Sequence, residues 1–247
     1  MILRAAWRSA ALGIALVIIV FRYTLLRMRG ELSLQQRAIW LHGACRLVLR
    51  TLGICYRLSG QHPPQRGLVV SNHLSYLDIL ILSAAMPCFF VAKKEIRRWP
   101  YFGWVARTGG SLFLDRTSHA SAAGVAESIA QRLELTIPVL FFPEGTSTDG
   151  TSVLRFRSWL FEPAIRACAP VTSASVRYLA PNGTSERDLC WFGDEAFLPH
   201  LWRTLGAAGV AAHVQFGAPQ VFSDRHLAAR RTHFEISAMR SGDLVPH

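Results

Sequence analysis

The stretch SNHLSYLD, residues 71–78, is the part of the sequence from which the fold is most easily read. It lies between two apolar runs, GLVV at 67–70 and ILIL at 79–82, and this succession predicts a strand, a polar turn and the start of a helix. The stretch holds an imidazole, His73, and a carboxylate five positions later, Asp78. On one continuous helix these side chains would point about 140° apart and could not meet.

With His73 in the turn and Asp78 in the first helical turn, the carboxylate can reach back to the imidazole. That contact fixes the tautomer and leaves the other ring nitrogen free to accept a proton, so the pair suits a general base acting on a hydroxyl. A second interpretation stays open, because Ser75 and Asp78 also have the spacing of a capping box, which needs no catalytic role.

Strand-like and helix-like segments alternate after this motif. Strands are predicted at 88–92, 110–114, 138–142 and 211–216, and the clearest helical periodicity covers 118–135. The alternation predicts an α/β fold, with a mostly parallel mixed sheet flanked by helices. We place this α/β domain at residues 61–247.

Polar residues follow three of the predicted strands directly. The clusters are Asn72/His73/Asp78, Asp115/Arg116 and Glu144/Gly145/Thr146. If the strands are parallel neighbours, the clusters meet at the carboxyl edge of the sheet, where ligands bind in open α/β folds. Each cluster also has a structural interpretation: Asp115 and Arg116 could form a surface ion pair, and the third cluster a tight turn with glycine at positive φ.

Residues 1–60 are basic and apolar. They contain nine arginines and one glutamate, and so carry +8 of the formal charge of +11. A basic segment with apolar helices indicates an anionic membrane surface, whereas nothing in the sequence has the spacing of a zinc finger or an RNA-binding motif, so we expect no nucleic-acid partner. The five cysteines are widely spaced without a CxxC pair, which predicts reduced, buried thiols in the cytosol.

Two helices are predicted in this segment. Residues 5–26 are apolar, but Arg8 and Arg22 leave only 13 uncharged residues between them, roughly 20 Å of helix against a hydrocarbon core of about 30 Å. We therefore favour an interfacial helix over a true span. Residues 34–58 are amphipathic, and although an ordinary surface helix fits equally well, the position favours a two-helix membrane-docking element at 1–60.

The motifs together resemble the glycerolipid (lysophosphatidate-type, 1-acyl-sn-glycerol-3-phosphate) acyltransferase family. The matching blocks are NHxxxxD at 72–78, GxxFLDR at 110–116 and FPEGT at 142–146, within about residues 35–178. The family implies transfer of an acyl chain from acyl-CoA or acyl carrier protein to a lysolipid hydroxyl at a membrane, with no metal and no other cofactor. We therefore expect the protein on the cytoplasmic face of the inner (plasma) membrane, monotopic or single-pass.

The resemblance also implies roles for single residues. His73 is the expected base and Asp78 its partner. The substrate-binding residues are expected to be Asn72, Lys93, Arg116, Glu144, Gly145, Thr146 and Arg157. Direct transfer needs a deprotonated acceptor hydroxyl and no enzyme nucleophile, which agrees with these residue types.

Two departures from the family pattern concern the acceptor. Ser147 stands where the phosphatidate-forming branch usually has arginine, and Ser173 replaces the second proline of the fourth block. The run TSTDG at 146–150 is similar to the branch that acylates lyso-ornithine lipids. By family frequency we expect 1-acyl-sn-glycerol-3-phosphate as acceptor, with lyso-ornithine lipid as the alternative. A His/Asp-dependent thioester or lipid hydrolase and a non-catalytic membrane adaptor are the alternatives from other classes.

Overall fold

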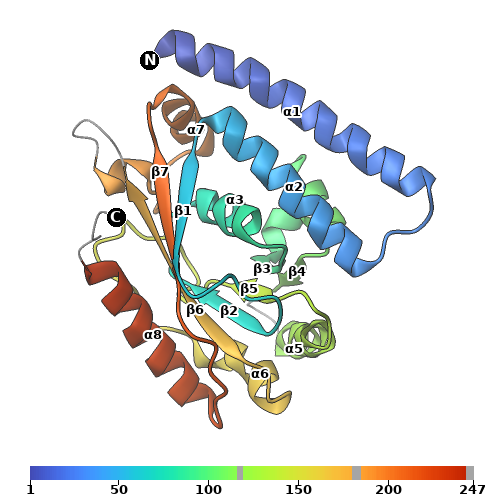
Figure 1. The fold of residues 1–247 in the computed structure, drawn as a ribbon, viewed down its shortest axis with the longest axis vertical. Helices are drawn as coiled ribbons and strands as arrows, with labels where there is room; N and C mark the ends of the chain where they lie inside the picture. Colours follow the sequence, from blue (N-terminus) through green and yellow to red (C-terminus); the bar gives the residue numbers. More distant parts are fainter. Residues whose placement is uncertain (116–118, 180–184, 243–247) are drawn as a thin grey trace.

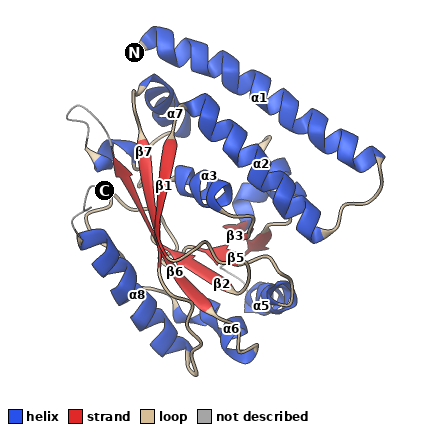
Figure 2. Cartoon of the chain, viewed as in Figure 1, coloured by secondary structure: helices blue, strands red, loops and turns tan. Residues whose placement is uncertain are grey.

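The computed structural model describes residues 1–115, 119–179 and 185–242. Within these residues seven strands form a sheet in the order β1-β7-β6-β2-β5-β3-β4. Neighbours are parallel except β6 and β7, which are antiparallel. The expected mostly parallel mixed sheet flanked by helices is confirmed (Figures 1 and 2). The strands are β1 (Cys55–Gly60), β2 (Leu68–Ser71), β3 (Phe89–Lys93), β4 (Leu112–Leu114), β5 (Val139–Phe141), β6 (Val171–Leu179) and β7 (Ala211–Phe216).

Helices cover both faces of the sheet (Figure 2). The longer helices are α1 (Ile2–Met28), α2 (Leu34–Leu52), α3 (Tyr76–Ala85), α5 (His119–Leu133), α7 (Phe197–Gly206) and α8 (Arg225–Ser241); the shorter ones are η1 (Lys94–Arg98), α4 (Phe102–Thr108), η2 (Ser158–Phe161), α6 (Glu162–Arg166) and η3 (Glu186–Leu189). Val69 packs into the core under α2 and α3, whereas Leu68 and Val70 pack into the core under α5, α6 and α8. This alternation is what a central strand between two helical layers requires.

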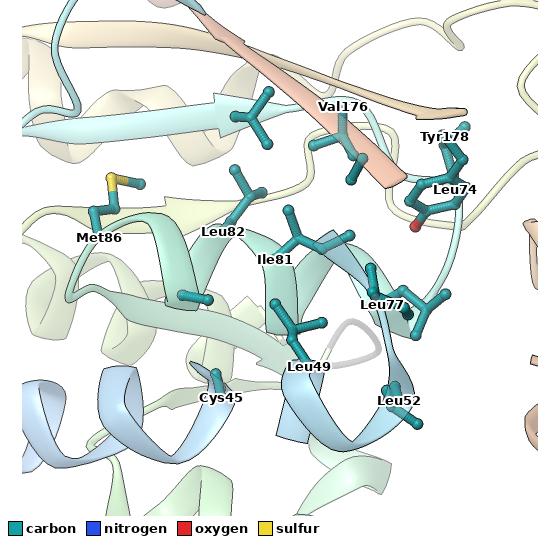
Figure 3. Packing of buried hydrophobic residues seen from close by; sticks show 14 of the residues in the cluster. Cys45, Leu49, Leu52, Leu74, Leu77, Ile81, Leu82, Met86, Val176 and Tyr178 are labelled. Carbon is teal, nitrogen blue, oxygen red and sulfur yellow. The ribbon is translucent and has the colours of Figure 1, made fainter. Parts of the chain in front are cut away.

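The second N-terminal helix is shorter than expected and faces inward. It ends at Leu52 because Gly53 adopts a left-handed conformation at its C-cap. Residues 55–58, which were expected to be helical, lie instead in β1 beside β7. The apolar face of α2, with Cys45, Leu49 and Leu52, packs against α3 in the core (Figure 3). One face of α2 therefore belongs to the core, and the membrane-docking role of the two helices stays a prediction. The division of the chain at residue 60 stays a prediction.

The first helix lies on the outside of the molecule along α2 and α7 (Figure 1). Ala5, Ala15 and Ile19 on its inner face are buried. Among the described residues, α1 is the helix long and apolar enough to cross a membrane, and little of its apolar surface is buried within the protein. Three of the five cysteines are buried as expected, but Cys55 and Cys168 are exposed.

Candidate active site

The site begins at the carboxyl end of β2. Residues 72–75 form a turn after this strand, and Ser75 caps α3. Asp78, in the first turn of α3, accepts a hydrogen bond of 2.8 Å from Nδ1 of His73. The N–H of Ser75 donates to the same oxygen, Oδ2, at 3.0 Å, which completes a capping box. The contact between His73 and Asp78 and the capping box are therefore both present.

Asp78 is fully buried, and hydrogen-bond donors surround its carboxyl group. Oδ2 also accepts from the N–H of Leu74 at 2.6 Å, and Oδ1 accepts a short hydrogen bond from the hydroxyl of Tyr178 at the end of β6. Burial, and the charge of Asp78 beside it, raise the pKa of Tyr178 well above its ordinary value, so this hydroxyl keeps its proton. The carboxylate in turn holds the imidazole in one orientation and leaves Nε2 as the nitrogen that can act as a base.

The imidazole stands in a cavity of about 550 Å³ at the carboxyl edge of the sheet. Its ring stacks on Phe142 with centroids 4.0 Å apart, and 19% of the side chain is exposed. Much of the lining is apolar or aromatic, including Phe90, Trp99 and Trp191. An apolar cavity with one base is suited to an acyl chain and a hydroxyl that must lose its proton.

Three predicted substrate-binding residues line this cavity, together with Ser147: Lys93 at the end of β3, and Gly145 and Thr146 after β5. Gly145 has φ = 81°, so the expected tight turn with glycine at positive φ is present. The first and third clusters of the sequence therefore meet at the carboxyl edge, as predicted. In the second cluster, Asp115 pairs with Nζ of Lys94 at 2.8 Å, and Arg116 lies outside the described residues.

Glu144 was expected to bind the acceptor's headgroup, and in the structure both of its carboxyl oxygens accept hydrogen bonds from backbone amides. It is 4% exposed; Oε1 accepts from the N–H of His73 at 2.7 Å and Oε2 from the N–H of Leu154 at 2.8 Å. The carbonyl of His73 accepts from the N–H of Thr148 at 2.9 Å. The segment after β5 thus holds the backbone of His73 on both sides, and we propose that Glu144 positions the base; its expected role in headgroup binding stays a prediction. Burial raises the pKa of Glu144 to about 7, although both amide donors oppose the shift.

Two further predicted binding residues do not line the cavity in the described part of the chain. Asn72 is buried; its Nδ2 donates to the carbonyl of Val176 at 3.0 Å, and its Oδ1 accepts from the N–H of Val176 at 2.8 Å. It therefore ties β2 to β6 beside the turn that carries His73. Arg157 is exposed at the start of η2, away from the cavity lining. Its role in headgroup binding stays a prediction.

Sequence reasoning missed Tyr178 and the aromatic wall formed by Tyr76, Trp99, Trp191 and Phe197. Trp191 packs edge-on against Tyr76, with centroids 5.8 Å apart, and Phe197 contacts Tyr76 at 5.0 Å. No local signal marks Tyr178, since its partner lies 100 residues earlier in the chain.

The chain matches known proteins over most of its length. The model of the family described as acyltransferase matches residues 54–177. A Lyso-ornithine lipid O-acyltransferase of Rhodobacter capsulatus is 37% identical over 73% of this chain and 67% of its own length, and a 1-acyl-sn-glycerol-3-phosphate acyltransferase of Neisseria gonorrhoeae is 30% identical over 74% and 71%. The crystal structure of the 1-acyl-sn-glycerophosphate acyltransferase from Thermotoga maritima has the same fold, with a TM-score of 0.69 and 18% identity over 96% of this chain and 93% of that one.

Proposed function

Because the chain belongs to the acyltransferase family, we propose that it moves a fatty acyl group from acyl-CoA or acyl carrier protein to the free hydroxyl of a lysolipid, with His73 as general base. The observation that carries this is the hydrogen bond from Nδ1 of His73, which lines a largely apolar cavity, to the buried carboxylate of Asp78. Nε2 takes the hydroxyl proton while the hydroxyl oxygen attacks the thioester carbonyl. The carbon–sulfur bond then breaks, and the proton passes to the departing thiolate.

We propose lyso-ornithine lipid as the acceptor, which reverses the order in which the sequence placed the two candidates. Ser147 lines the cavity where the phosphatidate-forming branch has arginine, so one charge-assisted contact to a phosphate is missing. The cavity lining contains a cation and an anion, Lys93 and Glu95, which suits a headgroup with both a carboxylate and an ammonium group. The name of the Rhodobacter capsulatus relative supports the same choice.

A glycerol phosphate acceptor is the second candidate. Lys93 in the cavity can pair with a phosphate, and the Neisseria gonorrhoeae relative is named for 1-acyl-sn-glycerol-3-phosphate. The two acceptors are distinguished by incubating the purified full chain with labelled acyl donors and each lysolipid in turn. A preference of tenfold or more for 1-acyl-sn-glycerol-3-phosphate would overturn the lead assignment.

We also propose that α1 lies in the membrane interface on the cytoplasmic face. Leu3, Trp7, Ile14, Val17 and Phe21 form an exposed stripe at helical spacing, each at least 61% exposed. The other face is fixed to the protein, since Arg8 donates to the carbonyls of Leu205 at 3.1 Å and Ala207 at 2.6 Å at the end of α7. A helix fixed to the protein on one face, with an apolar stripe exposed on the other, supports a monotopic arrangement with the stripe in lipid.

The test of the mechanism is His73→Ala. We expect turnover to fall by about 10² to 10⁴-fold, the usual contribution of a general base, with folding unchanged. His226→Ala, at an exposed position on α8, is the matched control and should leave turnover unaltered. Acyl transfer that survives His73→Ala would refute the mechanism, and donor cleavage at an equal rate without acceptor would favour the hydrolase.

A further inference from the structure

A second cavity, of about 540 Å³, is lined by residues of η1, of α4 and of the turn between them. The cationic residues that line it are Lys94, Arg97, Arg98 and Arg107, and the rings of Trp99, Tyr101 and Trp104 complete the wall. We call it the basic cavity. Neither the sequence motifs nor the proposed mechanism assigns a function to this cavity.

The charge of the basic cavity is only partly neutralised. Lys94 pairs with Asp115 at 2.8 Å. Arg97, Arg98 and Arg107 are exposed, and no carboxylate pairs with their guanidinium groups among the described residues. Three guanidinium groups around one hollow are suited to a phosphate, which accepts hydrogen bonds from their planar N–H groups.

The basic cavity adjoins the proposed active site. Residues of one short segment alternate between the two cavities: Lys93, Glu95 and Ile96 line the His73 cavity, whereas Lys94, Arg97 and Arg98 line the basic one. Trp99 lines both, and its ring is held by Trp191 at 6.4 Å and Phe197 at 6.1 Å between centroids. A single elongated ligand that passes Trp99 can therefore place one end in each cavity.

We propose that the basic cavity binds the phosphate of the donor's phosphopantetheine arm while the thioester lies beside His73. This rests on the proposed acyl transfer, because that reaction requires a donor whose reactive end is apolar and whose other end is anionic. Acyl-CoA and acyl carrier protein both carry the arm, so the contact is common to the two donors. The acceptor's headgroup then binds at the His73 cavity, with Lys93 and Glu95.

The test compares two small donors that differ only in the phosphate, acyl-phosphopantetheine and acyl-pantetheine. We expect the wild type to have at least a tenfold higher kcat/KM for the phosphorylated donor, since a charge-assisted contact changes affinity by roughly tenfold or more. In the double variant Arg97→Gln/Arg98→Gln this preference should fall below about threefold, with kcat/KM for acyl-pantetheine unchanged. The matched control is Arg230→Gln/Arg231→Gln, at two exposed arginines of α8, which should keep the full preference.

Three outcomes would overturn the proposal. One is an unchanged preference for the phosphorylated donor in the double variant. Another is a loss confined to acyl carrier protein, which would assign the arginines to the carrier's surface. The third is weaker binding to anionic vesicles together with an unaltered donor preference, which would assign them to lipid headgroups. An equal loss with acyl-CoA and acyl carrier protein supports the shared phosphate.

Binding without turnover separates this proposal from the proposed function. Titration calorimetry of the full chain in detergent should show that phosphopantetheine binds at least tenfold more tightly than pantetheine, and that the double variant removes the difference. This result supports the phosphate site even if no lysolipid is acylated. Equal binding of the two compounds refutes the phosphate site even if acyl transfer is observed.

Discussion

Oε1 of Glu144 accepts a hydrogen bond of 2.7 Å from the backbone N–H of His73, a residue 71 positions earlier in the chain. The other oxygen of this carboxyl accepts from the N–H of Leu154, so Glu144 joins the turn that carries the base to the loop that contains Leu154. A carboxyl group with both oxygens bonded to backbone amides positions the base and has little capacity left for a substrate. We therefore propose that its contribution to activity is indirect.

Glu144→Gln tests the raised pKa of the buried Glu144 through the pH dependence of the free energy of unfolding. The folded-state pKa of Glu144, about 7, lies above its ordinary value of 4.5, so the folded protein retains a proton that the unfolded chain has released between these pH values. The free energy of unfolding should thus fall by about 3 kcal/mol as the pH rises from 4.5 to 7. It should change little more at a pH well above 7.

The glutamine cannot titrate, so Glu144→Gln should lack this slope when unfolding by denaturant is measured in detergent at pH 5 and pH 8. The control is Glu127→Gln, at an exposed position on α5, which should keep the wild-type slope. A wild-type-like slope in Glu144→Gln would show that another group carries the pH dependence.

Tyr178→Phe removes one donor to the buried carboxylate of Asp78. A lost hydrogen bond to a charged group is expected to lower stability by about 1.5–3 kcal/mol and kcat by about tenfold or more. The remaining negative charge then rests more on Oδ2, which faces the imidazole, so the acid limb of the pH–kcat/KM profile should move to higher pH.

The matched control for that variant is Tyr56→Phe. The hydroxyl of Tyr56 donates to the carbonyl of Ala84 at 2.7 Å, away from the site, so this variant should lose stability without a change in the pH profile. If both variants give the wild-type profile, Tyr178 serves packing alone.

Ser147→Arg tests the acceptor. The side chain of Ser147 lines the His73 cavity, so an arginine there adds one guanidinium where a phosphate headgroup is expected. We expect kcat/KM for 1-acyl-sn-glycerol-3-phosphate to rise about tenfold or more, and kcat/KM for lyso-ornithine lipid not to rise. Ser152→Arg, at an exposed position of the same loop, should change neither value. Higher activity toward lyso-ornithine lipid in Ser147→Arg would contradict the assigned place of the headgroup.

Membrane docking is tested on the exposed stripe of α1. Trp7→Glu/Phe21→Glu replaces two exposed apolar side chains and should weaken binding to anionic vesicles by tenfold or more, since burying each such side chain contributes about 1.5–3 kcal/mol. Phe234→Glu, which changes an equally exposed ring on α8, should bind as the wild type does. Removing the chain up to residue 61 is a poorer test, because it deletes α2 from the core and β1 from the sheet. Vesicle affinity that survives the double substitution would rule out α1 as the docking surface.

The sequence by itself determined the parts of the site that lie close together in the chain. The strand, turn and helix around residues 68–85, and the contact between His73 and Asp78, follow from apolar runs and a spacing of five residues, because the backbone geometry of a turn fixes such short-range contacts. The glycine at position 145 likewise predicted a tight turn with positive φ, which the structure contains. The meeting of the first and third clusters needed only the assumption of parallel strands.

The tertiary structure alone decided which distant groups support that local motif. The strand β6 was not predicted, because its sequence, VTSASVRYL, contains small polar residues. These residues are buried only once β2 and β7 pair on either side of the strand. With β6 in place, Tyr178 reaches Asp78 and Val176 reaches Asn72. Residues 55–60 gave no strand signal, since an edge strand with one partner shows no regular alternation of burial. Contacts across 70 to 100 residues depend on strand order, and no local pattern encodes that order.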